Sequence, residues 1–184
     1  MATQVTRVLL RLPSALHASL RRAAKTSGLS LNEYIVRRLS APAPSLAASE
    51  DALAVMRRAK AVVGPRLLGL IVHGSWARGE AARGSDVDLL VVVARDAAIT
   101  RELYRIWDRE PVRWRGRVVD PHFVRLPDVG DRVTGLWAEA AIDGLVLYEA
   151  DDRLSAWLAR VRREIAAGRL VRRVVHGQPY WTAA

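Results

Sequence analysis

The chain has 184 residues, of which 51% are hydrophobic, enough for one core of moderate size and a small additional module. It contains no cysteine, which excludes disulfides and cysteine-ligated zinc. No apolar run approaches the ~20 residues of a membrane span. Arg7 and Arg11 interrupt the start of the chain, so a signal peptide is not expected. We therefore expect a cytoplasmic protein with no membrane partner.

The formal net charge of +10 is unevenly distributed. Residues 1–40 hold seven basic side chains and one acidic side chain, whereas residues 41–184 hold 22 basic and 18 acidic ones. A basic module on an otherwise ordinary chain is typical of a nucleic-acid contact. The alternative is a dimerisation module whose arginines are merely solvated.

The first 40 residues predict one strand and two helices. Thr6–Leu12 alternates as a strand does, and Ser14–Thr26 has the apolar spacing of an amphipathic helix. Ser30-Leu31-Asn32-Glu33 is a capping box for a second helix. Three short elements cannot bury a sufficient core alone, so we expect this module to form a homodimer or a higher oligomer.

Two segments of this module carry a resemblance. R-L-P-S-A-L-H at Arg11–His17 and G-L-S-L-N-E-Y at Gly28–Tyr34 resemble the ribbon-helix-helix DNA-binding domain of the Arc and HicB-antitoxin type. In such dimers the two N-terminal strands pair into a ribbon that enters the major groove of DNA.

The resemblance implies which residues contact DNA. Arg7, Leu9 and Arg11 would face the bases, and arginine suits guanine O6 and N7. The helix start at Ser30 and Asn32 would hold a phosphate through its N–H groups. Leu9 departs from the polar residue usual at the middle position, which weakens the expected sequence specificity.

Residues 41–49 form a Pro/Ala/Ser-rich linker, which we expect to be extended. They separate a module at residues 1–40 from a second domain at residues 50–184. The second domain opens with a predicted helix over Glu50–Val63. Its expected inward-facing residues are Leu53, Met56, Ala59 and Val63.

The most informative stretch lies early in the second domain. After an apolar strand at Leu67–Val72 comes the pair Gly74-Ser75, and after ten intervening residues the sequence Asp86-Val87-Asp88 opens a second apolar run. Residues i and i+2 of a strand point to the same face, so the two carboxylates would converge. Such donors suit Mg²⁺ carrying substrate phosphates. A Gly-Ser turn that opens a helix offers backbone N–H groups to those phosphates.

If Asp86 and Asp88 bind Mg²⁺ for nucleotidyl transfer, the reaction needs a third acid. Two-metal nucleotidyl transfer requires carboxylates that hold both metal ions and a base beside the attacking hydroxyl, and Asp120 is the candidate. Arg117–Val124 reads as a strand in which Asp120 could face Asp86 and Asp88. Pro121 removes a ladder donor and belongs at a strand edge or bulge. The alternative is that Asp120 only ends a strand at a turn before Pro121.

The Gly-Ser and Asp-x-Asp spacing resembles the active-site motif of the DNA polymerase β superfamily, and more closely its minimal nucleotidyltransferases. Several of these act as antitoxins paired with HEPN-type toxins. The similarity extends from about Leu53 to Trp181, and Trp76 departs from the smaller or basic residue common after Gly-Ser. The resemblance implies an α+β fold with a mixed sheet flanked by helices. It also implies two Mg²⁺ ions, an NTP such as ATP, and an acceptor hydroxyl on a toxin protein or on an RNA such as tRNA.

Two arginines between these motifs, Arg78 and Arg83, are candidates for binding phosphate. Only two of the 29 basic residues are lysines, so both can equally be solvated residues of an arginine-rich chain, with Glu80 pairing with one of them. His73 is expected to be a packed residue at a strand end rather than a ligand.

The remaining sequence predicts alternating helices and strands. We expect helices over Ala98–Trp107 and Val133–Ile142, a strand over Leu145–Tyr148, and a helix from Asp151 that Gly168 ends. The tail to Trp181 is expected to pack as a hydrophobic segment with a charged exterior.

Two other functions fit parts of the sequence. One is a DNA-binding antitoxin or autorepressor whose nucleotidyltransferase scaffold is catalytically silent. The other is an antibiotic-modifying transferase, which needs an acidic pocket for a polycationic substrate. An arginine-rich chain with a DNA-binding module disfavours the second.

Overall fold

The computed structural model describes Leu9, Leu12 and residues 14–26, 29–40, 49–175 and 178–183. These form two compact units, Met1–Arg37 and Arg38–Ala184. The expected first strand, apart from Leu9 and Leu12, and the expected linker, apart from Ser49, lie outside the described residues. Within the described part of the chain, no helix has both the length and the apolarity to cross a membrane.

The first unit contains α1 (Ser14–Thr26) and most of α2 (Leu31–Ser40). The predicted capping box is confirmed, because the Ser30 N–H donates to Glu33 Oε2 at 2.9 Å and the Glu33 N–H donates to Ser30 Oγ at 3.2 Å. These bonds also lower the pKa of the exposed Glu33 carboxyl. Two of the free N–H groups at the start of α2 are thereby satisfied.

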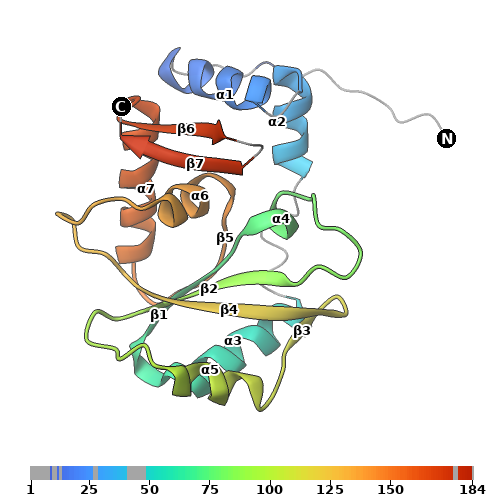
Figure 1. Ribbon diagram of the computed structural model, residues 1–184, viewed down its shortest axis with the longest axis vertical. Helices are drawn as coiled ribbons and strands as arrows, with labels where there is room; N and C mark the ends of the chain where they lie inside the picture. The colour runs from blue at the N-terminus through green and yellow to red at the C-terminus, as the bar shows by residue number, and fades with distance from the viewer. Residues whose placement is uncertain are drawn as a thin grey trace. The chain divides into compact units, whose positions relative to one another are not determined.

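The second unit is built on a five-stranded mixed sheet with the order β3-β4-β2-β1-β5 (Figure 1). Strands β2 and β4 run parallel, and the other neighbouring pairs are antiparallel. The strands are β1 (Leu67–Val72), β2 (Val87–Val93), β3 (Arg113–Trp114), β4 (Arg117–Arg125) and β5 (Leu145–Glu149).

Helices cover both faces of this sheet (Figure 1). On one face lie α3 (Glu50–Val63), which continues into the short 3-10 helix η2 (Gly64–Arg66), and α5 (Arg101–Asp108). On the other face lie α6 (Gly135–Asp143) and α7 (Arg153–Ala166). The prediction of an α+β fold with a mixed sheet flanked by helices is confirmed for this unit.

Strand β2 is central because it contributes to both cores. Leu89 and Val91 pack with α3 and α5, whereas Leu90 and Val92 pack with α6 and α7. A strand buried on both faces reads as a continuous apolar run, as this one does. The run begins immediately after Asp88, so the sheet interior and the acidic motif are directly adjacent.

The predicted inward face of α3 is confirmed for Ala59, which is buried, and for Met56 and Val63, which are partly buried and pack against the core. Ala52 and Val55 are also buried in this core, whereas the predicted Leu53 is only partly buried.

The C-terminal segment packs as expected, because Leu170 and Trp181 lie against the core formed with α6 and α7, and it does so as an antiparallel hairpin of β6 (Leu170–Val175) and β7 (Gln178–Ala183), which was not predicted. It is tied to α6 through Glu139, whose Oε1 accepts hydrogen bonds from Trp181 Nε1 at 2.8 Å and Arg172 Nε at 3.0 Å.

Gly144, which ends α6, gives a test of how tightly this helix packs on β1. A Cβ atom there would lie 2.3 Å from the Ala140 carbonyl oxygen and 2.6 Å from Ile71 Cγ2. We expect Gly144→Ala to lower the free energy of unfolding by about 1–3 kcal/mol, as overpacking does. Denaturant titration measures the change. Gly130→Ala is the matched control, because nothing lies within 4 Å of a Cβ at that position. Equal stability of the two variants would contradict the described packing.

Candidate active site

Three aspartates gather where β2 and β4 begin. Asp88 and Asp120 are register partners on these two parallel strands, so their side chains leave neighbouring backbone positions on one face. Asp86 lies one residue before β2, close enough for its charge to raise the pKa of Asp120. The structure therefore brings together the three acids that the sequence singles out.

Pro121 lies inside β4 without interrupting it. The Val119 N–H donates to the Val112 carbonyl at 3.0 Å, on the side of the strand facing β3. Backbone N–H groups two residues apart in a strand point the same way, so the missing donor of Pro121 also points away from β2. The strand continues to Arg125, and the alternative in which Asp120 ends a strand at a turn does not hold.

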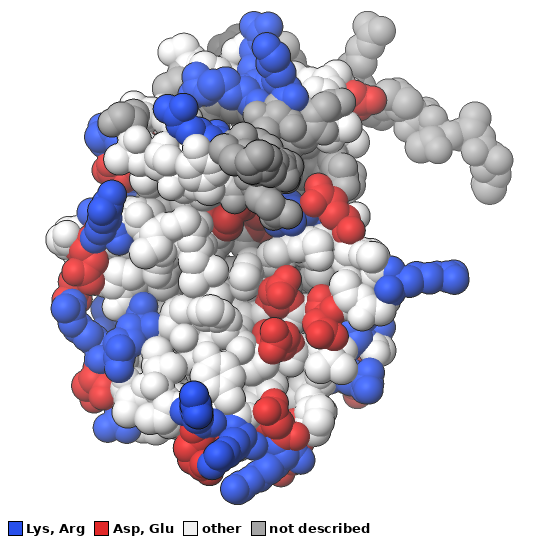
Figure 2. Space-filling view, viewed as in Figure 1, with Lys and Arg blue, Asp and Glu red and all other residues white. Residues whose placement is uncertain are grey.

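The three carboxylates repel one another. Partial burial raises the pKa of the Asp120 carboxyl above its ordinary value, and the negative charges of Asp88, Asp86 and then Asp108 raise it further. Among the described residues, no arginine or lysine forms an ion pair with Asp86, Asp88 or Asp120. Figure 2 shows acidic side chains near the middle of one face and basic side chains mainly toward its margins. In a chain with 29 basic residues, such an uncompensated acidic cluster is notable.

Gly74 lies directly against this cluster. Its φ of 73° is in the left-handed region, and a Cβ atom there would lie 2.1 Å from Asp88 Oδ2. The preceding His73 N–H donates to the Asp88 carbonyl at 3.0 Å. Gly74 opens α4 (Gly74–Ala77), a single helical turn that also carries Ser75. Glycine is therefore needed here for both its conformation and its lack of a side chain.

The donor set suits a hard divalent cation in its chemistry. Carboxylate oxygens are the ligands that Mg²⁺ takes, commonly one or two from the protein together with substrate phosphates. In the part of the chain that is described, no three Asp, Glu or His side chains are placed closely enough to form a complete metal site by themselves.

Arg78, a predicted phosphate ligand, is directed toward acids. Its Nε donates to Glu80 Oε2 at 2.8 Å, and its NH1 lies 3.8 Å from Oδ2 of the buried Asp143 on α6. Burial has the largest single effect on the pKa of Arg78, and it lowers that pKa. The hydrogen bond and charge of Glu80, together with the charges of Asp143 and Glu139, outweigh burial, so the pKa of Arg78 is raised overall. Arg83 is exposed and has no hydrogen bond or ion pair with any described residue.

His73 and Trp76 are packed rather than presented to a ligand. Burial lowers the pKa of His73, an effect that His122 and Arg78 increase and Asp88 opposes, so the imidazole is neutral at pH 7. Its Nε2 is buried and has no hydrogen-bond partner among the described residues. Trp76 packs against Trp114 of β3, with 5.2 Å between ring centroids. Trp76, the residue that departs from the expected pattern, therefore packs against the core.

Two residues near the site, Asp108 and Arg117, were not predicted from the sequence. Asp108, at the end of α5, contributes to the raised pKa of Asp120. Arg117, at the start of β4, donates from NH1 to the carbonyl oxygens of Ala82 and Ser85, each at 2.7 Å, and to Ser85 Oγ at 2.9 Å. More than 30 residues separate Arg117 from this loop, so no local pattern could indicate the contact.

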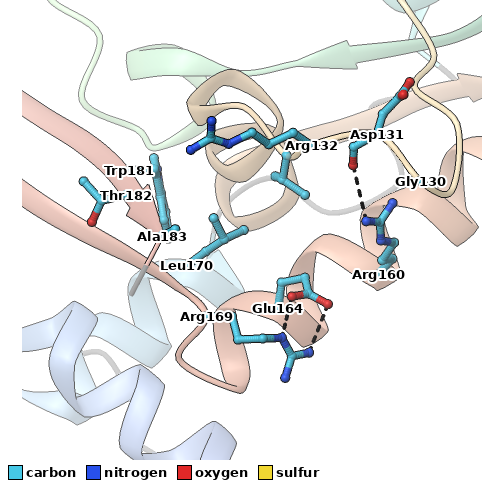
Figure 3. A pocket seen from close by; sticks show the side chains of 11 residues that line it. Gly130, Asp131, Arg132, Arg160, Glu164, Arg169, Leu170, Trp181, Thr182 and Ala183 are labelled. Atoms are coloured by element: carbon cyan, nitrogen blue, oxygen red, sulfur yellow. Dashed lines mark hydrogen bonds and ion pairs between the residues drawn. The ribbon is translucent and has the colours of Figure 1, made fainter.

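A cavity of about 630 Å³ lies elsewhere in the second unit, between residues 130–133, α7 and the β6–β7 hairpin (Figure 3). Two of its arginines already have partners: Arg169 forms an ion pair with Glu164, and Arg160 donates to the Asp131 carbonyl. None of the predicted site residues lines it. The acidic cluster is therefore the stronger candidate for chemistry.

Two solved structures resemble part of the chain. One is described as a toxin–antitoxin with AMP-PNP, with 18% identity and a TM-score of 0.43, covering 66% of this chain and 93% of that chain. The other is a mutant of the toxin–antitoxin MntA-HpeT, with 15% identity and a TM-score of 0.42, covering 63% of this chain and 90% of that chain. No curated protein matches.

Family models match two separate segments. Residues 7–39 match the HicB family, and residues 59–138 match the family described as nucleotidyltransferase domain. The second match spans Gly74, Ser75 and all three acids. The chain thus resembles a nucleotidyltransferase domain over residues 59–138 and the HicB family over residues 7–39.

Proposed function

We propose that this protein is a Mg²⁺-dependent enzyme that transfers a nucleoside monophosphate from an NTP, with ATP the expected donor, to a hydroxyl group of a protein or an RNA. One observation carries the proposal. Asp88 and Asp120 are held in register on paired strands, without a compensating cation among the described residues, and the Gly74 backbone lies against them. This arrangement supports binding of a phosphate-bound cation beside a reactive hydroxyl.

In this proposal, phosphate binding, metal binding and proton acceptance are carried out by different residues of the site. The backbone of Gly74 and Ser75 holds the β- and γ-phosphates, and Asp86, Asp88 and Asp120 hold two Mg²⁺ ions. When bound, the ions neutralise phosphate charge and polarise the P–O bonds. The acceptor oxygen bonds to the α-phosphorus while the bond to pyrophosphate breaks, and Asp120 accepts the hydroxyl proton.

The two loop arginines, Arg78 and Arg83, are not equally available to bind phosphate. Arg83 has no partner to give up among the described residues, so it is available to contact the phosphates. Arg78 can contact them only by exchanging its bond to Glu80.

The acceptor is proposed to be a HEPN-type toxin or a tRNA, in a toxin–antitoxin setting. This rests on the similarity of the Gly-Ser and Asp-x-Asp motif to antitoxin nucleotidyltransferases and on the HicB-family region.

Changing the acids tests the catalytic proposal. We expect Asp88→Asn and Asp120→Asn each to reduce transfer of label from α-³²P-ATP to lysate protein or RNA by about 100-fold or more, because each removes a charge that the reaction needs. Asp152→Asn is the matched control, since that exposed acid starts α7 without a side-chain capping bond. Turnover that survives the first two changes would refute the assigned roles. No transfer by the unaltered protein with any NTP would leave a silent scaffold with DNA binding as the function.

Repulsion within the cluster predicts a stability effect independent of turnover. The pKa of the Asp120 carboxyl is higher in the folded state than in the unfolded state. The stability that its protonated form contributes is therefore fully present below the unfolded-state pKa near 3.8 and is lost as the pH rises through the folded-state pKa. Asp120→Asn fixes a neutral side chain, so we expect a higher melting temperature than the unaltered protein at pH 7 in EDTA and little difference at pH 3. In an Asp88→Asn background the gain at pH 7 should shrink. A variant that melts earlier at pH 7 would contradict the described repulsion.

We also propose that the HicB-family region binds DNA as a ribbon-helix-helix dimer. In the first unit Leu16 and Val36 are 41% and 51% exposed, which supports a second copy that covers apolar surface. The capping box uses the N–H groups of Ser30 and Glu33, and those of Leu31 and Asn32 have no hydrogen-bond acceptor among the described residues, which supports a phosphate contact there.

DNA binding is measured by titrating the duplex upstream of this reading frame, with a shuffled duplex for comparison. We expect affinity to fall steeply with salt, because phosphate contacts release counterions. Arg7→Ala and Arg11→Ala should each weaken binding to the upstream duplex by about 1–3 kcal/mol. Arg101→Ala, an exposed arginine of α5, is the control. Affinity that is unaffected by Arg7→Ala and Arg11→Ala would exclude the ribbon as the reading element.

A further inference from the structure

The three acids of the site are not held in the same way. Asp88 and Asp120 lie within the ladder of β2 and β4, whose register begins with Val87 opposite Val119. Asp86 precedes that ladder by one residue, so the sheet does not fix its backbone. It ends a loop that leaves α4 and contains Gly79 and Gly84, both with left-handed φ angles. Something other than the sheet must therefore order Asp86.

The guanidinium group of Arg117 holds the end of this loop in place. Arg117 NH1 donates to both carbonyl oxygens that bracket the last turn of the loop, those of Ala82 and Ser85, and to Ser85 Oγ. The Ser85 hydroxyl in turn donates to the Ala82 carbonyl at 2.9 Å. The Ser85 carbonyl belongs to the peptide group that links Ser85 to Asp86. The contact thus fixes the peptide plane directly before the acid.

Arg117 is itself held firmly. It pairs with the fully buried Trp114 at the end of the β3–β4 hairpin. The hairpin turn is restrained because the Arg115 N–H donates to Asp51 Oδ2 at 3.0 Å, and Arg113 NH1 donates to the Gly116 carbonyl at 2.8 Å. A rigid donor on a rigid hairpin can position a loop that has no ladder of its own.

We propose that Arg117 is a positioning residue of the active site, which places Asp86 beside Asp88 by fixing the Ala82–Ser85 turn. This rests on the proposed nucleotidyl transfer for its functional consequence. Arg117 directs its donors to backbone and hydroxyl oxygens of the loop, and its effect passes through Asp86. Loss of Arg117 loosens one acid and leaves the paired acids in place.

The first test needs no activity. Amide hydrogen exchange of the peptide spanning residues 79–87 is compared between the unaltered protein, Arg117→Met and Arg125→Met. Arg125 is the matched control, because it lies at the other end of β4 and donates from Nε to the Ala97 carbonyl at 3.1 Å. We expect faster exchange in this peptide for Arg117→Met alone, with unchanged exchange in the β2 ladder. Equal exchange in the two variants overturns the proposal, whether or not the protein is an enzyme.

The second test measures the Mg²⁺ dependence of nucleotidyl transfer. We expect Arg117→Met to lower the rate at limiting Mg²⁺ by about 10–100-fold, as a small misplacement of a catalytic group does. Saturating Mg²⁺ should restore part of the rate, Arg117→Lys should be intermediate, and Arg125→Met should match the unaltered protein. Faster loop exchange with an unchanged Mg²⁺ dependence would overturn the positioning role. An inactive unaltered protein would refute the proposed function and leave the exchange test of the loop contact standing.

Discussion

The architecture of the site depends on holding like charges together. Asp88 and Asp120 are register partners on parallel strands, and Gly74 presses its backbone against the Asp88 carboxylate. Burial first, and then the negative charges of Asp88 and Asp86, raise the pKa of Asp120 in this arrangement. The arrangement is sustained because β2 is buried on both faces, so the two cores fix the strand that carries Asp88.

The short β3–β4 hairpin links the two halves of the motif. Trp114 packs against Trp76 on the Gly-Ser helical turn, and Arg117 holds the loop that leads to Asp86. One hairpin therefore supports both ends of the segment between the Gly-Ser pair and the acids. A site assembled from a turn, a loop and two strands gains its geometry from this shared support.

The sequence was sufficient where the signals are local. Apolar runs predicted β1 and β2, and the capping box of Ser30 and Glu33 formed as expected. The alternation within Arg117–Val124 predicted a strand that carries Asp120, and in the structure Asp120 is the register partner of Asp88. Contacts across long separations were not predictable, and so the partner of Arg78 on α6 and the role of Arg117 were missed. The β6–β7 hairpin was missed because its register depends on pairing that composition does not encode.

Pro121 has a consequence for the behaviour of the protein in concentrated solution. From Asp120 onward, the outer edge of β4 has no strand partner within the described sheet. Such an edge is a template on which another chain can add a strand and start aggregation. Proline cannot donate to an incoming strand, and the exposed charge of Asp120 beside it disfavours close approach. Pro121, which leaves the pairing of β4 with β2 intact, therefore also protects the outer edge of β4 from self-association.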